Sequence, residues 1–219
     1  EWTLPPAAAS RYAALREQSV PEDRPFLRGG IWRNFLSRYA EANWMHKRML
    51  GLSARLAASP RSAEQALQSL LHAAQANDAY WHGLFGGLYL PHLRRAVWRS
   101  LLALEAALDQ GSSARPAGRA DVDFDGLDEL FLSNGELQVV VRDDGLGAVH
   151  ELSSYVLTHN FGDTLRRYPE HYHRTCDGPG ESSAEPEHEG IASAHDRRLS
   201  KTSITPSDLA TDAIGRLLG

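Results

Sequence analysis

The sequence predicts an α+β protein in two parts, an N-terminal helical bundle followed by an incomplete antiparallel β-sandwich. Up to about Gln110 the apolar residues recur at intervals of three and four, which is the spacing of one helix face. After Ala120 the interval becomes two, which is typical of strands with one buried face. The segment between is rich in Gly, Ser and Pro, as linkers are. We therefore expect a helical domain over residues 1–110, a linker over 111–120 and a partial β domain over 121–219.

Three helices are expected in the helical domain. The first carries an apolar stripe of Ala42, Met45, Met49, Leu52 and Leu56, and ends at Ser59-Pro60. The second begins where Ser62 and Gln65 resemble a capping box, and carries Ala66, Leu67, Leu70, Leu71 and Ala74 inward. The third runs from about Leu90 to Leu108, with Pro91 in its first turn, where a missing N–H is tolerated. These stripes predict the core of a helical bundle.

A hairpin is the clearest element of the β domain. Residues 129–133 and 136–142 both read as strands, and they are separated by Asn134-Gly135, the strongest short-range hairpin signal. Residues 148–158 predict one or two further strands. Four or five strands form a thin sheet with open edges, so the β domain is expected to be incomplete.

Composition bounds the function only loosely. The 219 residues carry a formal net charge of -5, and no segment concentrates Lys and Arg, so no nucleic-acid partner is expected. No apolar run approaches the roughly 20 residues of a membrane span, and no signal peptide heads the chain. Cys176 is the single cysteine, which excludes an internal disulfide. These features predict a cytoplasmic protein without membrane contact. Because the chain starts at Glu1, we expect an N-terminus that is processed, cut or incompletely read.

The segment from Asn77 to His82 holds the most informative group of side chains. Asn77, Asp78, Trp81 and His82 combine a flat aromatic ring with hydrogen-bonding groups, which is how proteins bind a sugar ring. If the helix from Ala63 persists to His82, Asp78, Trp81 and His82 share one arc of the helix. The alternative is a helix end with a buried tryptophan and a capping aspartate. The pair Gly86-Gly87 favours the binding site, because it permits a sharp turn and close backbone approach.

A second candidate site is the acidic segment from Asp121 to Gly126. Asp121, Asp123 and Asp125 stand at alternate positions before a glycine, as in calcium-binding loops. The EF-hand pattern requires a glutamate where Leu132 stands, so a complete EF-hand is excluded. A looser calcium loop with Glu129 as an extra ligand is one interpretation, and an acidic turn that starts the hairpin is the other.

Five segments spread along the chain resemble one family. They are residues 1–5 (EWTLP), 26–35 (FLRGGIWRNF), 41–49 (EANWMHKRM), 77–95 and 166–173 (RRYPEHYH). They resemble the α-amylase/4-α-glucanotransferase branch of glycoside hydrolase family 57. The resemblance implies a three-part enzyme: an N-terminal (β/α)₇ barrel, a helical domain and a C-terminal β-sandwich of the galactose-mutarotase type. The retaining Glu/Asp pair of the family lies on the barrel, so no catalytic residue is assigned in this chain.

The resemblance also assigns roles to the candidate residues. Residues 77–87 match the last signature region of the family, in which Trp81 would stack on a sugar and Asp78 would bond its hydroxyls. Asn77, Tyr80 and His82 belong to the same motif. The chain would then be a non-catalytic part of a retaining α-1,4-glucan-acting enzyme, an α-amylase or a 4-α-glucanotransferase, and would build one wall of the glucan cleft.

The expected partners are an α-1,4-glucan or maltooligosaccharide and the N-terminal barrel of the same enzyme. A basic cluster, Arg28, Arg33, Lys47 and Arg48, would form ion pairs with that barrel. No cofactor is expected beyond the structural calcium, and a homodimer is left open. The alternatives are a stand-alone carbohydrate-binding module without catalysis and a remnant that folds poorly.

Overall fold

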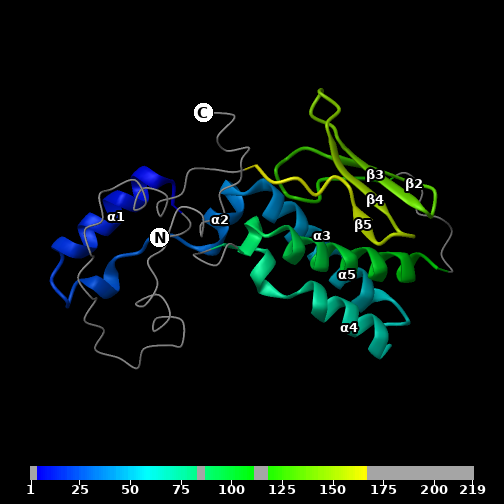
Figure 1. Ribbon diagram of the computed structural model, residues 1–219, viewed down its shortest axis with the longest axis horizontal. Helices are drawn as coiled ribbons and strands as arrows, with labels where there is room; N and C mark the ends of the chain where they lie inside the picture. The colour runs from blue at the N-terminus through cyan, green and yellow to red at the C-terminus, as the bar shows by residue number, and fades with distance from the viewer. Residues whose placement is uncertain (1–3, 83–86, 111–117, 167–219) are drawn as a thin grey trace. The chain divides into compact units, whose positions relative to one another are not determined.

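The computed structural model describes residues 4–82, 87–110 and 118–166, which divide between two compact units (Figure 1). The smaller unit contains, among its described residues, α1 (Pro6–Gln18) and the short 3₁₀ helix η1 (Arg24–Phe26). The larger unit, residues 31–83 and 87–166, contains every other described element. None of the described helices is long and apolar enough to cross a membrane.

The helical part of the larger unit confirms the three predicted helices. Its elements are α2 (Trp32–Arg38), α3 (Ala40–Ala58), α4 (Gln65–Ala74), η2 (Asn77–Ala79), η3 (Gly87–Tyr89) and α5 (Pro91–Asp109). All five residues of the predicted stripe on α3 are buried. Pro91 is the first residue of α5, as expected. The sequence did not indicate α1 and α2, whose apolar residues form no long stripe.

The predicted capping box at the start of the second helix is wrong. α4 begins at Gln65 with Glu64 at the N-cap, and no side chain caps it. Two tight turns, in which Ser62 donates to the carbonyl of Ser59 and Glu64 to that of Arg61, occupy the preceding residues. Because these turns use the local backbone groups, Ser62 lies outside the helix.

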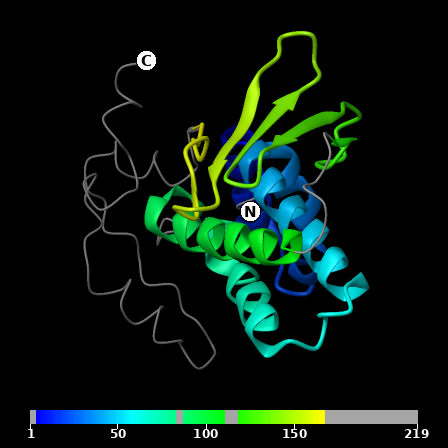
Figure 2. The ribbon, with the colours of Figure 1, turned by 90° about the vertical axis from the view of Figure 1, so that its right-hand side faces the viewer.

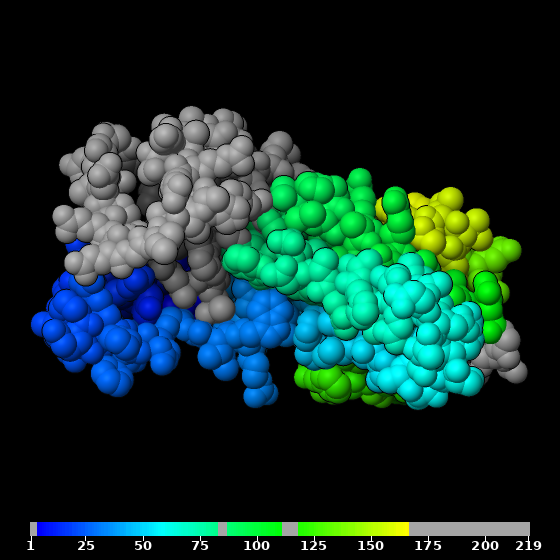
Figure 3. Space-filling view, turned by 90° about the horizontal axis from the view of Figure 1, so that it is seen from below, coloured from blue at the N-terminus to red at the C-terminus, as the bar shows by residue number. Residues whose placement is uncertain are grey.

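Helix α5 lies at the centre of the larger unit. Figure 2 shows the sheet on one side of α5 and α4 on the other, and both α3 and α4 pack against α5. Figure 3 shows α4 at the surface on this second side. The core between the helices is apolar and includes the buried residues Leu52, Leu56, Leu67, Leu101 and Leu104.

The sheet confirms the predicted antiparallel arrangement. Its strands are β1 (Gly118–Ala120), β2 (Glu129–Ser133), β3 (Leu137–Arg142), β4 (Val149–Ser154) and β5 (His159–Asn160), in that spatial order. The predicted hairpin is β2–β3, with Glu129 opposite Arg142. Gly135 has φ +90°, and the Asn134 side chain accepts hydrogen bonds from the N–H groups of Glu136 and Leu137. The two predicted turn residues therefore form the turn.

The two faces of the sheet have an unusual polarity. The buried face carries polar side chains on three strands, Glu129, Gln138, Glu151 and Ser153. Apolar residues lie on the other face and remain partly exposed, among them Leu132, Leu137 and Leu152. The predicted period of two is confirmed, but the side chains that face the helices are largely polar. These polar groups therefore need hydrogen-bonding partners from the helices.

Arg48 on α3 supplies the main partner. Its guanidinium donates to Glu105 on α5 at 2.5 and 3.1 Å and to Glu151 on β4 at 3.0 Å. Gln138 and Trp44 also donate to Glu151, at 3.1 and 3.2 Å. The expectation that Arg48 forms ion pairs with the N-terminal barrel is thereby corrected, because its carboxylate partners lie within this chain.

Candidate functional site

The predicted sugar-binding segment begins where α4 ends. α4 stops at Ala74, and the N–H of Gln75 closes the last turn on the carbonyls of Leu71 and His72. Ala76 has a non-helical backbone conformation (φ −58°, ψ 119°), and Asn77–Ala79 then forms the single 3₁₀ turn η2. The interpretation of one helix persisting to His82 is therefore wrong, since Asn and Asp favour turns over helix interiors. The candidate residues are placed by a turn and not by a shared helical arc.

The turn divides the segment into an outer and an inner set of side chains. Asn77 and Asp78 are exposed, and Trp81 is 40% exposed. Tyr80 is buried, and its hydroxyl donates a 2.6 Å hydrogen bond to the carbonyl of Ala74. Burial raises the pKa of Tyr80 far above its usual value. The exposed ring of Trp81 argues against the alternative of a helix end with a buried tryptophan.

His82 lies beneath this surface. It is fully buried, its Nε2 lies 2.7 Å from the hydroxyl of Tyr39, and its ring contacts the rings of Phe35, Tyr39 and Tyr89. A side chain in this position holds the segment against α2 and the start of α3. The structure thus separates His82 from Asn77, Asp78 and Trp81, which face solvent.

Gly87 fixes the backbone behind Trp81. Its φ is +47°, and a Cβ at this position would lie 2.2 Å from the carbonyl oxygen of Trp81. The N–H of the next residue, Leu88, donates to that same oxygen at 2.8 Å. The close backbone approach predicted for this glycine is therefore confirmed, and only glycine fits it. Gly86 lies outside the described residues.

Arg94 on α5 also stabilises the backbone behind Trp81. Its Nη1 donates to the carbonyl of Leu88 at 2.6 Å, and its Nε donates to Asp163 at 2.9 Å. The guanidinium is almost entirely buried. A chain of hydrogen bonds therefore runs from Trp81 through Leu88 and Arg94 to the segment that follows β5.

The acidic loop is held by its own carboxylates. Asp121 accepts hydrogen bonds from the N–H groups of Asp125 and Gly126, both at 3.1 Å, and Asp123 accepts one from Asp125. Asp125 forms an ion pair with Arg142. Oxygens of Asp121, Asp123 and Asp125 lie within 4.8 Å of one another. The loop geometry agrees with the acidic-turn interpretation, and calcium at these three residues stays a prediction.

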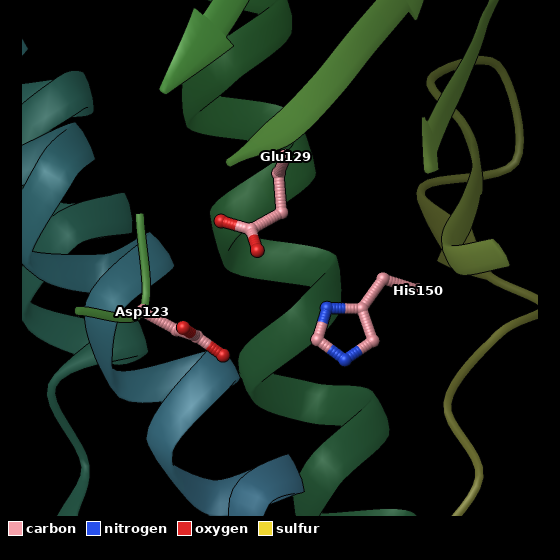
Figure 4. A group of neighbouring side chains, drawn as sticks. All are labelled: Asp123, Glu129 and His150. Atoms are coloured by element: carbon pink, nitrogen blue, oxygen red, sulfur yellow. The ribbon is translucent and has the colours of Figure 1, made fainter. Parts of the chain in front are cut away.

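A second group of metal-ligating side chains includes one of these aspartates. Asp123, Glu129 and His150 bring one donor atom each within 4.8 Å of one another, and Figure 4 shows both carboxylates and the imidazole facing a common space. Burial and the neighbouring Asp125 raise the pKa of Asp123, and burial raises the pKa of Glu129. Sequence reasoning missed His150, because no spacing in the sequence links it to the loop.

Comparison with known proteins identifies the family. Residues 30–108 match the middle domain of the alpha-amylase/4-alpha-glucanotransferase family, and residues 121–218 match its C-terminal domain. The chain is 42% identical over 201 residues to a 4-alpha-glucanotransferase of Thermococcus kodakarensis and 43% identical over 201 residues to an alpha-amylase of Pyrococcus abyssi. Each alignment covers 90% of this chain and 29% of the relative. The chain thus spans less than a third of the length of these relatives.

A solved structure agrees with this assignment. The crystal structure of 4-alpha-glucanotransferase from Thermococcus litoralis matches with a TM-score of 0.69 and 38% identity, over 80% of this chain and 27% of that one. The helical region and the antiparallel sheet thus have the arrangement of a known family member. This chain belongs to the α-amylase/4-α-glucanotransferase family, glycoside hydrolase family 57, and corresponds to its middle and C-terminal domains.

Proposed function

We propose that this chain forms the non-catalytic part of a retaining enzyme that acts on α-1,4-glucans, and that it contributes one wall of the glucan-binding cleft. The relatives carry the names alpha-amylase and 4-alpha-glucanotransferase at nearly equal identity. Family membership therefore supports the substrate class, and the choice between water and sugar as acceptor is left to experiment.

The exposure of Trp81 on a fixed backbone supports a glucan cleft at this turn. Trp81 is exposed, while the backbone that bears it is fixed by Gly87 and by the buried His82. An aromatic ring presented on a rigid support can stack on the apolar face of a glucose ring with little loss of side-chain freedom. Asp78 and Asn77, in the turn η2 that precedes Trp81, are exposed and can form hydrogen bonds with hydroxyls.

The catalytic pair is proposed to lie on the N-terminal barrel, as the family resemblance implies. Asp123 and Glu129 approach the carboxylate separation of a retaining pair, about 5 Å. Glu129 is fully buried, however, so a glycosidic bond cannot reach it. We therefore assign these two carboxylates no catalytic role.

Sugar binding by the chain itself provides the test. Titration of maltoheptaose into the chain, followed by calorimetry, is expected to give measurable affinity that Trp81→Ala weakens by about tenfold or more, which corresponds to about 1.4 kcal/mol. Trp32→Ala is the matched control, because Trp32 is equally exposed, at 40%. Equal affinity in the wild type and Trp81→Ala would exclude the cleft wall at this turn.

The same titration separates the alternative function. A stand-alone carbohydrate-binding module would bind maltoheptaose without help, and its affinity would not change when the N-terminal barrel of a relative is added. A cleft wall would bind more tightly with the barrel present, since each part then contributes contacts to one ligand.

A further inference from the structure

Three side chains from separate segments converge beside the first residue of β2. Asp123 belongs to the acidic loop, Glu129 opens β2, and His150 lies on β4. Their donor atoms lie within 4.8 Å of one another, and Figure 4 shows the three groups facing one another. Two carboxylates and an imidazole form a donor set that proteins use for divalent metal ions.

An irregularity in β4 directs His150 into this group. Val140 pairs with Glu151, but the next residue, Val141, pairs with Val149, so His150 is an extra residue in the ladder. Such a β-bulge redirects a side chain that regular alternation would place on the other face. The ring of His150 accordingly lies on the helix side of the sheet, with its centroid 4.9 Å from the ring centroid of Trp44 on α3.

Glu129 provides the second, independent observation. The residue is fully buried, and one of its oxygens, Oε2, accepts a 2.8 Å hydrogen bond from the N–H of Val122. The other oxygen, Oε1, is buried and has no hydrogen-bond partner among the residues that the structure describes. Nδ1 of His150 is likewise buried and has no hydrogen-bond partner within the described part of the chain. Buried polar atoms are nearly always paired, so each of these calls for a ligand.

The surroundings allow an ion to enter. Asp123 lines an open pocket of about 670 Å³ together with Asn43 and Lys47, and His150 lines another of about 180 Å³. The neighbouring Arg142 is engaged with Asp125, outside the group of three. Two of the three side chains therefore line pockets through which an ion could approach, and Arg142 forms its ion pair with Asp125.

We propose that Asp123, Glu129 and His150 bind a divalent transition-metal ion of the zinc class, with Oε1 of Glu129 and an imidazole nitrogen of His150 as ligands. The imidazole favours this class over calcium, which takes oxygen ligands. Small side-chain rotations would bring the donors to metal-ligand distances of about 2.0–2.2 Å. The ion would tie the acidic loop to β2 and β4 and would have a structural role, apart from the proposed sugar site at Trp81.

Metal binding to the purified chain tests this proposal. The chain is stripped with a chelator, and its thermal unfolding is compared without metal and with Zn²⁺ or Ca²⁺. At a free Zn²⁺ concentration about 100 times Kd, the melting temperature is expected to rise by roughly 5–10 °C. Equilibrium dialysis should give about one zinc-binding site that depends on the three residues, and Co²⁺ in its place should show visible absorption typical of low coordination number.

Matched variants identify the ligands. Glu129→Gln and His150→Gln are each expected to weaken Zn²⁺ binding by about tenfold or more, because each removes a ligand. Asp121→Asn is the control, since Asp121 belongs to the acidic loop but not to this group, and it should leave Zn²⁺ affinity unchanged. If a variant fails to fold, the Co²⁺ spectrum and the zinc stoichiometry of the wild type still decide.

Two results would overturn the proposal. One is Ca²⁺ binding that depends on Asp121 and Asp125 and is unaffected in His150→Gln, which would place an ion in the acidic loop instead. The other is Zn²⁺ binding that is absent, or that persists at full affinity in a folded His150→Gln variant.

Discussion

Arg48 and Glu151 lie 103 positions apart in the sequence, yet Nε of Arg48 donates a 3.0 Å hydrogen bond to Oε2 of Glu151. The side chain of Arg48 is 5% exposed and that of Glu151 is fully buried. Glu105 on α5 shares the same guanidinium. Two helices and the sheet are therefore joined by one buried charged group, which makes the interface sensitive to the loss of any single partner.

Removal of this cation should be severely destabilising. We expect Arg48→Met to lower the free energy of unfolding by about 3–5 kcal/mol, because Glu105 and Glu151 would remain buried without their cation. Urea unfolding followed by circular dichroism measures the change.

An exposed arginine with two carboxylate partners provides the comparison for Arg48. Arg119 pairs with Asp128 and Asp143, and its side chain is 62% exposed. Arg119→Met should therefore change stability by about 1 kcal/mol or less. Equal losses in the two variants would show that burial of the Arg48 network does not matter.

A second prediction concerns the backbone behind Trp81. Gly87→Ala should destabilise the chain by about 1–3 kcal/mol, since a Cβ would meet the Trp81 carbonyl and the residue has a positive φ. It should also weaken maltoheptaose binding, because the turn that presents Trp81 would shift. Gly51→Ala, inside α3 with open space around it, should instead stabilise by about 0.5–1 kcal/mol. Urea unfolding measures the free energy of unfolding of both variants. A change of the same sign in the two would contradict this explanation.

A third prediction concerns acid stability. Burial and the neighbouring Lys47 lower the pKa of His46 below its usual value of 6.5. Around and below pH 6.5 the His46 imidazole therefore takes up a proton more readily in the unfolded chain than in the folded chain. His46 thus has no effect on the free energy of unfolding well above pH 6.5, and it lowers that free energy as the pH falls. We expect His46→Gln to lose less stability than the wild type between pH 7.5 and 5.5. Parallel stability curves for the two proteins over that range would refute the assignment.

A fourth prediction follows from the apolar face of the sheet. Leu132 lies opposite Val139, which lies opposite Leu152, so the three form a continuous row across the sheet. Leu132 and Leu152 are 43% and 38% exposed. Such a row promotes association between molecules. Leu132→Thr should reduce concentration-dependent association in sedimentation measurements with little change in the melting temperature, and unchanged association would argue against this face.

Local patterns in the sequence were sufficient to predict several elements. The stripe from Ala42 to Leu56 predicted α3, Pro91 marked the start of α5, and Asn134-Gly135 predicted the β2–β3 turn. In each case the information lies within a few neighbouring residues, and tertiary contacts reinforce it.

The features that the sequence did not predict depend on distant contacts. The burial of His82 depends on Tyr39, which lies 43 positions earlier in the sequence. The partners of Arg48 come from α5 and β4. His150 reaches Glu129 only because of a bulge in the ladder. None of these relationships has a fixed spacing in the sequence, so periodicity cannot predict them.

The most direct test of the cleft wall is a chimera. In the 4-alpha-glucanotransferase of Thermococcus kodakarensis, the segment that matches this chain is replaced by residues 1–219, and turnover of maltooligosaccharides is measured. We expect an active chimera in which Trp81→Ala lowers kcat/KM by about tenfold or more while the melting temperature stays within a few degrees. Trp32→Ala should leave kcat/KM nearly unchanged. Full activity in the Trp81→Ala chimera would contradict the proposal that this turn contacts the glucan.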